Sequence, residues 1–375
     1  MVLLEALQHR YDTTLVTGAP FDCRRLNQAY HTDVDEGRIT VRVAPMPKFV
    51  RNAVAGDALR GAFFGRFVKE IGEYYDVCIS AYNFFDFGSP AIQFVADFSW
   101  DDDIRRAFDP NPPGLRGTFQ RPGLMRRAYL ALTDLIRSGH HEPDPRGEDI
   151  VVANSRWTAD LLARRLGIDA RVIYPPVYAP AARDQPRIND IVMLGRISPD
   201  KRILEAIEIL AQVRQRGYDF SFHIIGQLDD SGYSNQVRAK AADCDHWVRL
   251  TGGLYGEAKF DFLSRHAFAL HVRRREAFGI AVAEMVKMGL VPFVPADSAP
   301  AEIVCDARLT FQDADDAVET IDRMLRQPKQ IGGVRRKLKE RGALFSKERF
   351  TAEVQDLVEH AMNNRTRTPP RALSE

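Results

Sequence analysis

The chain has 375 residues, of which 45% are hydrophobic and 27% charged, and its basic and acidic residues cancel to a net charge of +1. This length exceeds one ordinary hydrophobic core and predicts two domains in a soluble globular protein. The balanced charge excludes a global attraction to nucleic acid, and no run of eighteen apolar residues predicts a membrane span. Four scattered cysteines without a Cys-x-x-Cys pair or a signal peptide predict reduced thiols in the cytoplasm.

Strand and helix patterns alternate along the whole sequence, which predicts parallel sheets covered on both faces. In the first half, strands are predicted at 13–18, 39–45, 75–82, 91–97 and 149–155, and helices at 2–11, 59–75 and 124–139. In the second half, strands are predicted at 190–195, 221–227, 247–252, 268–272, 291–296 and 308–312. Helices are predicted there at 202–217, 235–244, 257–266, 281–289 and 345–364. Each half is therefore predicted to be a Rossmann-like α/β unit.

Basic and aromatic residues are interleaved in two parts of the first half. The segment 59–75 mixes aromatic side chains with Arg60, Arg66 and Lys69, and further arginines lie between 105 and 127. One interpretation is a surface that meets the inner face of a membrane or a lipid-phosphate acceptor. The other is a pair of amphipathic helices whose apolar sides face the core and whose charges are solvated.

Two polar clusters in the first half could be considered for a metal ion. Asp101–Asp103 is similar to an Asp-x-Asp metal motif, and His140 and His141 stand beside Glu142. The acidic run, however, lies far from the glycine and cation motifs of the second half. Adjacent histidines point apart, and no third ligand is near them in sequence. We therefore predict a solvated loop or a helix N-cap for the acidic run, loop residues for the histidines, and no metal site at either place.

A strand, a glycine, cations and a helix follow one another early in the second half. The apolar run 190–194 precedes Gly195 and Arg196, and Lys201 and Arg202 open the next predicted helix. Arginine offers a bidentate fork to phosphate oxygens and lysine a point charge, so together they suit a diphosphate. Taken alone, either residue is better explained as a solvated surface cation. Together with the Glu276 and Glu284 motif described next, the phosphate interpretation is favoured.

Glu276 and Glu284 enclose the segment EAFGIAVAE. Between them, Phe278, Gly279 and Ile280 allow the backbone to approach a ligand closely and are typical of a helix start. The N–H groups and partial positive charge at such a helix start favour a phosphate. Glu276 is then expected in the loop before the helix and Glu284 inside it, where they contact different parts of one ligand.

The segment from about 150 to 304 resembles the family 4 glycosyltransferases of the GT-B fold, also called glycosyl transferases group 1. The resemblance rests on VVANSRWTADLLARRLGIDARVIYPPV, GRISPDKR and REAFGIAVAEMVKMGLVPFV. These passages are similar to the family's entry into its linker, its donor-phosphate motif and its Glu-x7-Glu motif. There is also some likeness to dolichol-linked mannosyltransferases of the Alg11 type. The resemblance implies two Rossmann-like domains with a ligand cleft between them and a C-terminal helix that crosses back to the first.

The resemblance also assigns roles to the residues of these motifs. Arg196 and Lys201 would bind the donor diphosphate, while Glu276 would meet sugar hydroxyls near the transferred carbon. Glu284 would meet the ribose hydroxyls. Further donor contacts would come from Gly195, Gly226, Tyr255, His271, Phe278, Gly279 and Ile280. For Gly226 and Tyr255, a turn glycine and a half-buried aromatic residue are equally compatible with the sequence.

The implied domains are an acceptor-side domain over 1–178, a donor-binding domain over 186–345, the crossing helix over 346–363 and a tail over 364–375. The composition of the tail predicts disorder. The family's first strand and Gly-Gly loop have no counterpart before the predicted helix 2–11. Either the true start lies upstream or the sheet lacks its central first strand. Asp97 stands where many relatives carry a histidine, and it can equally cap the turn.

The implied activity is retaining transfer of a hexose from a nucleotide-diphosphate sugar to a glycan or lipid-linked acceptor, without a metal or other cofactor. The mechanism favoured for the family is a front-face displacement in which the departing phosphate takes the acceptor's proton. Glu276 and Glu284 are then not a glycosidase pair. The alternative is a truncated, non-catalytic protein that binds a nucleotide sugar or another partner. The sequence leaves the base, sugar and acceptor open.

Overall fold

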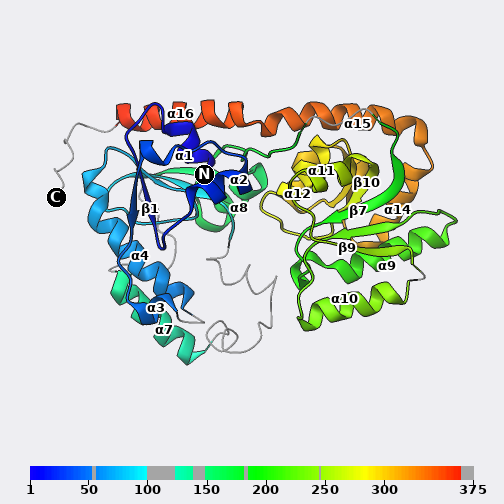
Figure 1. The fold of residues 1–375 in the computed structure, drawn as a ribbon, viewed down its shortest axis with the longest axis horizontal. Helices are drawn as coiled ribbons and strands as arrows, with labels where there is room; N and C mark the ends of the chain where they lie inside the picture. The colour runs from blue at the N-terminus through cyan, green and yellow to red at the C-terminus, as the bar shows by residue number, and fades with distance from the viewer. Residues whose placement is uncertain (53–55, 99–122, 138–147, 181–184, 245, 365–375) are drawn as a thin grey trace. The chain divides into compact units, whose positions relative to one another are not determined.

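The computed structural model describes residues 1–375 except 53–55, 99–122, 138–147, 181–184, 245 and 365–375 (Figure 1). Its chain divides into two units. Unit 1 comprises Met1–Asn154, Ala159–Ile173 and Lys347–Glu375, and unit 2 comprises Ser155–Thr158 and Tyr174–Ser346. Both units are α/β with parallel strands, which confirms the predicted fold class.

The strands of unit 1 form two separate parallel sheets among the described residues. One pairs β1 (Thr13–Thr17) with β2 (Ile39–Val43). The other has the order β3 (Cys78–Ser80), β4 (Ala91–Val95), β5 (Ile150–Ala153) and β6 (Arg171–Val172). The α-helices of this part of the chain are α1 (Val2–Leu7), α2 (Cys23–Tyr30), α3 (Lys48–Arg51), α4 (Asp57–Ile71), α7 (Leu124–Arg137), α8 (Arg156–Leu166) and α16 (Lys347–Asn364).

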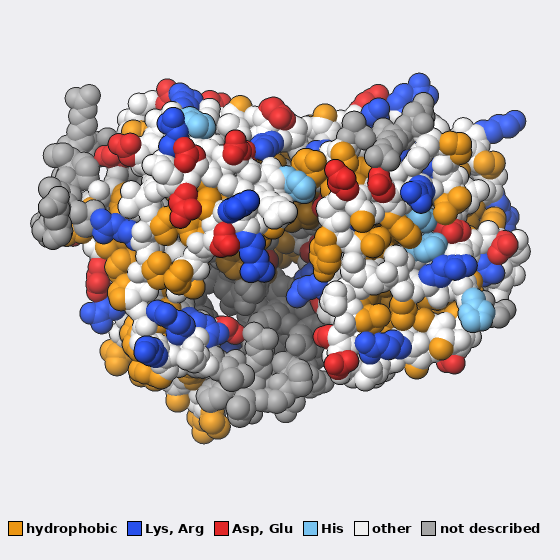
Figure 2. Space-filling view, viewed as in Figure 1, with side chains coloured by type: hydrophobic (Ala, Val, Ile, Leu, Met, Phe, Trp, Pro, Cys, Tyr) orange, Lys and Arg blue, Asp and Glu red, His pale blue; other side chains and the backbone are white. Residues whose placement is uncertain are grey.

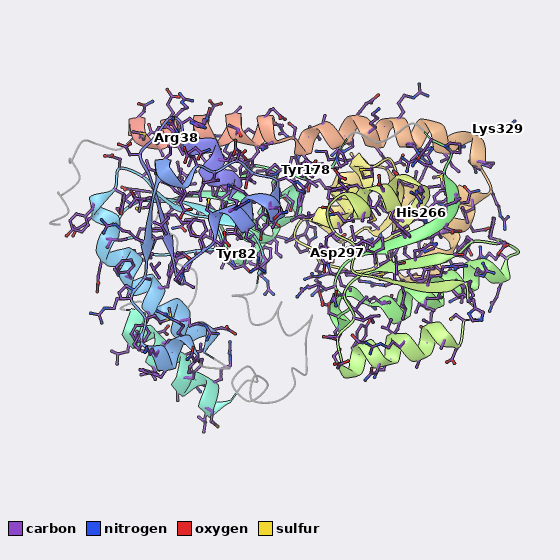
Figure 3. The ribbon with its side chains drawn as sticks, in the orientation of Figure 1. Arg38, Tyr82, Tyr178, His266, Asp297 and Lys329 are labelled. Carbon is purple, nitrogen blue, oxygen red and sulfur yellow. The ribbon has the colours of Figure 1, made fainter. Side chains whose placement is uncertain are left out.

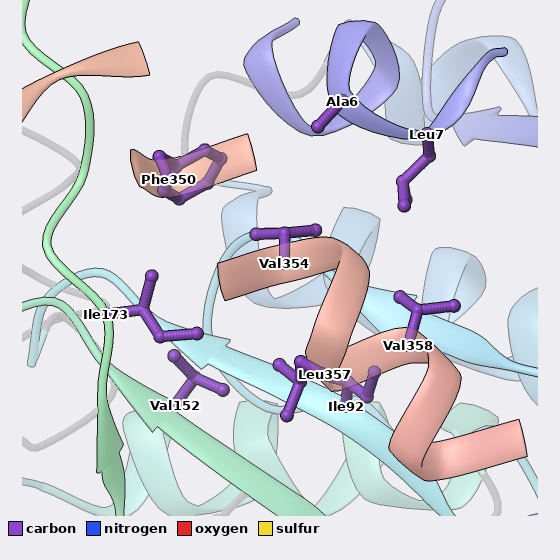
Figure 4. Packing of buried hydrophobic residues seen from close by; sticks show 9 residues of the cluster. All are labelled: Ala6, Leu7, Ile92, Val152, Ile173, Phe350, Val354, Leu357 and Val358. Carbon is purple, nitrogen blue, oxygen red and sulfur yellow. The ribbon is translucent and has the colours of Figure 1, made fainter. Parts of the chain in front are cut away.

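The last helix of the chain packs into the core of unit 1 (Figure 4). Phe350, Val354 and Leu357 of α16 belong to one buried cluster with residues of α1, β4 and β5. Burial of each such side chain stabilises the unit by about 1.5–3 kcal/mol. At the edge of this contact, Lys347 Nζ lies 2.8 Å from a Glu5 carboxylate oxygen. Helices α1 and α16, near the two ends of the described chain, therefore pack in the same core.

Unit 2 contains a six-stranded parallel sheet in the order β12, β11, β10, β7, β8, β9. The strands are β7 (Ile188–Leu194), β8 (Phe222–Ile225), β9 (Val248–Gly252), β10 (His266–Leu270), β11 (Val291–Pro295) and β12 (Thr310–Phe311). The α-helices are α9 (Ile203–Gln215), α10 (Gly232–Ala242), α11 (Gly256–Ser264), α12 (Ile280–Lys287), α13 (Ala299–Val304), α14 (Ala314–Leu325) and α15 (Pro328–Gly342).

All neighbouring strands of this sheet run parallel, so their carboxyl ends lie at one edge. β10 and β11 are buried at every position, as expected for strands covered on both faces. Figure 1 shows α9 and α10 on one side of the sheet and α11 and α12 on the other. The strand order changes direction between β7 and β10, and loops at such a switch point form the binding edge of α/β sheets.

Of the described α-helices, α2, α3, α13, α14 and α15 were not among the sequence predictions, and α8 lies in the first passage on which the family resemblance rests. α15 contains Gly332 and Gly333, which lower helix propensity, but burial of Val334 and Leu338 against unit 2 outweighs that preference. α14 carried a usable signal, because its buried positions recur at helical spacing. None of the helices in the described ranges combines the length and hydrophobicity that crossing a membrane requires. All four cysteines are described, and all are free.

Candidate functional site

The loops at the carboxyl edge of the unit 2 sheet carry the predicted site residues. Gly195, Arg196 and Lys201 follow β7, Gly226 follows β8, and Tyr255 follows β9. The loop after β10 contains His271, Glu276, Phe278 and Gly279, and it leads into α12, which holds Ile280 and Glu284. α12 begins at Ile280, one residue before the predicted helix 281–289. Lys201 differs slightly from prediction, because it ends a 3₁₀ turn before α9.

The loops after β7 and β8 are in close contact through two glycines. The Gly195 N–H donates to the Ile225 carbonyl at 3.0 Å, and the Gly226 N–H donates to the Gly252 carbonyl at 2.9 Å. A Cβ on Gly226 would lie 2.1 Å from the Gly195 carbonyl oxygen. Only glycine therefore fits at position 226, because a side chain would force the two strand ends apart.

Glu276 is the centre of an ion cluster. Its Oε2 lies 2.8 Å from Lys201 Nζ and 3.2 Å from an Arg273 guanidinium nitrogen. The side chains of Lys201 and Glu276 are only 15% and 16% exposed, so solvent weakens this interaction little. Burial alone would raise the pKa of Glu276, but the positive charges of Lys201 and Arg273 lower it below its ordinary value. Glu276 is therefore ionised at neutral pH.

His271 follows β10 directly, lies next to Glu276 of this cluster, and is 3% exposed. Burial lowers the pKa of His271 to about 4, although the Glu276 carboxylate opposes the shift. At neutral pH the ring is therefore uncharged, and its 3.8 Å approach to Glu276 is not an ion pair. Its Nε2 is buried without a hydrogen-bond partner among the described residues. A polar ligand could supply that partner.

We expect the burial of neutral His271 to make the stability of unit 2 depend on pH. The unfolded chain takes up a proton near the ordinary pKa of 6.5, whereas the folded chain does so at about 4. Stability therefore falls as pH drops from 6.5 towards 4, by up to about 3 kcal/mol. Urea unfolding at several pH values would measure this, and His271→Asn should lose this part of the slope. The exposed-histidine control His360→Gln should keep it; an unchanged slope in His271→Asn would contradict the expectation.

The start of α12 requires a glycine for two reasons. Gly279 has φ +96°, and a Cβ there would lie 2.8 Å from Pro300 Cγ. No side chain caps this helix start. Phe278 is buried against the rings of Tyr174 and Phe345, whereas Ile280 is 57% exposed. Phe278 therefore anchors the loop, and the helix start presents its backbone outward, where a phosphate could bind.

Hydrogen bonds on both sides fix the loop that carries Glu276. The Ala277 carbonyl accepts from the hydroxyls of Ser155 at 2.7 Å and Thr158 at 3.1 Å. The Glu276 carbonyl accepts from the Ala299 N–H at 3.0 Å. Such support holds the carboxylate in position before a ligand arrives, which is what preorganised electrostatic sites require.

The second glutamate of the motif has its own cation. Glu284 Oε1 lies 2.7 Å from Lys259 Nζ of α11, and both side chains are largely buried. The two glutamates therefore belong to separate ion pairs, consistent with contacts to different parts of one ligand.

Arg196 and Tyr255 are not buried like the two glutamates. Both are exposed, and the structure gives the Arg196 guanidinium no ion pair among the described residues.

Sequence reasoning missed Arg273 and Lys259. Arg273 bridges Glu276 and Asp200, at 3.2 Å from each. Arg273 lies three residues before Glu276, which could have indicated it. However, it is one of three consecutive arginines, and the sequence does not reveal which of them contacts Glu276.

Asp101–Asp103 and His140–His141 lie outside the described residues. Asp97 is described, and its carboxylate accepts hydrogen bonds from Tyr82 and Asn83.

Part of the chain is similar in sequence to known glycosyltransferases. Residues 181–344 match the family model described as "Glycosyl transferases group 1". Over these residues, less than half of its length, the chain is similar to the group 1 glycosyltransferases. The chain is 20% identical over 244 residues to "GDP-Man:Man(3)GlcNAc(2)-PP-Dol alpha-1,2-mannosyltransferase" of Dictyostelium discoideum. The match covers 58% of the chain and 48% of the relative, so the chain spans about half the length of the curated relative it matches.

Solved glycosyltransferases share the fold over nearly the whole chain. The structure titled "Crystal structure of Anabaena Alr3699/HepE in complex with UDP and glucose" is 12% identical, covers 96% of this chain and 95% of its own, and has a TM-score of 0.64. A glycosyltransferase from Rickettsia africae ESF-5 is 13% identical, covers 97% and 94%, and has a TM-score of 0.61. These similarities confirm the predicted GT-B fold of the chain.

Proposed function

We propose that this protein is a glycosyltransferase that moves a hexose from a nucleotide-diphosphate sugar to a glycan or lipid-linked acceptor, with retention of configuration and without a catalytic metal. The observation that carries the proposal is the buried Lys201–Glu276 pair, beside the glycines that bring the loops after β7 and β8 together. Its carboxylate and cations lie at the edge where ligands bind in α/β sheets. The complex of the HepE structure with UDP and glucose agrees with a donor of this class.

The charges of the site suit the departure of a diphosphate. Breaking the bond between the anomeric carbon and phosphate leaves positive charge on the sugar and negative charge on the diphosphate. Lys201 and Arg196 would neutralise the diphosphate, while ionised Glu276 would stabilise the sugar. The acceptor oxygen forms the new bond to the same face of the anomeric carbon. Its proton passes to the departing phosphate oxygen, so neither glutamate needs to act as a nucleophile.

The surface of unit 1 supports an acceptor that is anchored to lipid. Phe49 of α3 and Leu124 and Leu135 of α7 are 73%, 82% and 78% exposed, and Figure 2 shows hydrophobic side chains gathered near these helices. Isolated apolar residues are common on surfaces, but several large ones on neighbouring helices suit the boundary of a bilayer. We therefore extend the proposal to peripheral contact with the inner face of a membrane.

Donor binding followed by transfer tests the proposal. We expect one of UDP, GDP and ADP to raise the melting temperature, since a ligand at 100 times its Kd adds about 2.7 kcal/mol. Arg196→Ala should lose this shift, whereas Arg249→Ala, an exposed arginine of β9, should keep it. Transfer from the matching sugar donor would then be measured with a soluble glycan and with a polyprenyl-phosphate acceptor in anionic vesicles, and product NMR would report the anomer.

The outcomes separate the parts of the proposal. Equal rates with and without added Mg²⁺ or Mn²⁺ would support transfer without a catalytic metal. An inverted product would contradict retention, and a rate that ignores the vesicles would contradict membrane contact. Donor binding without any transfer would favour a non-catalytic nucleotide-sugar-binding protein. If no nucleotide changed the melting temperature, the donor assignment itself would be wrong.

A further inference from the structure

A second cluster of chemically reactive side chains lies at the opposite edge of the unit 2 sheet. Asp190, His223 and His266 come from β7, β8 and β10, which are neighbours in the sheet. One ligand atom from each lies within 4.8 Å of those of the other two. His266 opens β10, whereas His271 follows its end, so about 15 Å of strand separates this cluster from the Glu276 site. The transfer reaction proposed above does not use it.

His266 has the hydrogen bonding of a metal-ligating histidine. Its Nδ1 lies 2.7 Å from the Phe262 carbonyl in the last turn of α11, which assigns the ring proton to Nδ1. The lone pair is then on Nε2. That atom is buried and has no hydrogen-bond partner among the described residues, and the whole residue is 2% exposed. Metal-bound histidines are commonly oriented by such a bond from the other ring nitrogen.

The other two residues are already placed at a distance that suits a shared ion. His223 Nε2 lies 3.1 Å from Asp190 Oδ2. Two ligands of a tetrahedral Zn²⁺ with bonds of about 2.0–2.1 Å are separated by about 3.3 Å. The second Asp190 oxygen accepts from the Ser221 N–H at 2.8 Å, which fixes the carboxylate. His223 and His266 are 4.9 Å apart between ring centres, and the Phe262 ring contacts both.

We propose that Asp190, His223 and His266 bind a divalent transition-metal ion of the Zn²⁺ type, with water as a further ligand. Two imidazoles and one carboxylate are a donor set that zinc favours over the harder Mg²⁺ and Ca²⁺. The side chains of Asp190 and His223 are 22% and 13% exposed, so water and the ion can enter from their side. His266 can be located in Figure 3. The ion would join three strands and stabilise unit 2.

The positive charge of Arg187 is expected to limit the affinity of this site for a metal ion. Arg187 donates to the His266 carbonyl at 2.8 Å and also to the Met288 carbonyl, so its charge is fixed beside the cluster. The Arg187 charge repels a bound metal ion, and of the three ligands only Asp190 contributes a negative charge. The site is therefore expected to bind less tightly than a structural zinc site with four protein ligands.

Cobalt titration of the full chain without a polyhistidine tag tests the site. We expect one equivalent of Co²⁺ to bind with the visible absorption of four- or five-coordinate cobalt, Zn²⁺ to displace it, and either ion to raise the melting temperature. His266→Gln and His223→Gln should each weaken binding by more than the 10- to 100-fold typical of losing an outer-sphere partner. His360→Gln, which replaces an exposed histidine of α16, should bind cobalt like the unaltered chain.

Each result bears on the proposal independently of sugar transfer. Circular dichroism would confirm that the variants are folded; should the buried His266→Gln unfold, the more exposed His223→Gln carries the test alone. Unaltered chain that binds no cobalt at millimolar concentration would overturn the site. So would binding that persists in folded His223→Gln, because the ion would then lie elsewhere. None of these readouts requires activity, so a failed transferase assay leaves the outcome interpretable.

Discussion

Lys201→Met is expected to lower the kcat of sugar transfer by about 10²- to 10³-fold, the usual effect of removing one preorganised donor from developing negative charge. Lys201 lies 2.8 Å from Glu276 in a largely buried pair, so its ammonium is fixed where the proposed diphosphate departs. Steady-state kinetics with the identified donor would measure the loss. Because methionine keeps most of the side-chain volume, the effect reports the charge.

The matched control is Lys240→Met. Lys240 belongs to the same unit, but its 3.8 Å contact with Glu208 joins two exposed side chains. Exposed pairs contribute little, so this variant should retain full turnover. Lys201→Met turning over as fast as Lys240→Met would contradict the proposed role. Poor folding is distinguished by the melting temperature without nucleotide.

Glu276→Gln should separate binding from transfer. Removing the carboxylate leaves Lys201 and Arg273 more available to a diphosphate, so the Kd of the free nucleotide diphosphate should stay the same or fall. The kcat should nevertheless drop by about 10²- to 10³-fold, since the positive charge on the sugar loses its partner. Calorimetric binding and steady-state kinetics on one preparation would show the divergence. Parallel losses of binding and turnover would contradict it.

The same variant should also change stability in a pH-dependent way. Loss of the buried carboxylate takes the partner from Lys201 and leaves Arg273 with Asp200 alone, which costs about 3 kcal/mol. The pKa of Glu276 is lowered in the folded chain, so its contribution is complete above the ordinary pKa of 4.5 and disappears as pH falls below it. Urea unfolding of Glu276→Gln against the exposed Glu208→Gln would measure this difference. A constant difference across acidic pH would rule out this explanation.

The strands and the main glycines could be predicted from local sequence. β11 and the second half of β7 (residues 191–194) are continuous apolar runs, and such runs indicate strands covered on both faces. Gly279 was informative because a positive φ and contact with Pro300 leave no room for a side chain. α15 was not predicted because its glycines lower the helix propensity of the segment. The helix is stabilised instead by the burial of Val334 and Leu338, which the local sequence does not reveal.

The partners of the charged residues could not be predicted. The sequence identified Glu276, Glu284 and Lys201, but it did not pair Glu284 with Lys259 or choose Arg273 from its run of arginines. Ion pairing depends on which side chains converge from different strands, and spacing along the chain carries no information about that. Asp190, His223 and His266 were overlooked for the same reason, since 33 and 43 residues separate them in sequence.

The sequence by itself determined the alternating α/β pattern, the turns that only glycine can form and the types of charge available to a ligand. These features depend on neighbouring residues, whose backbone preferences and apolar spacing are local. The tertiary structure decided that Glu276 is ionised and His271 neutral, although both are buried within one cluster. Their charge states depend on the balance between lost solvation and the cations that the folded sheet brings to them.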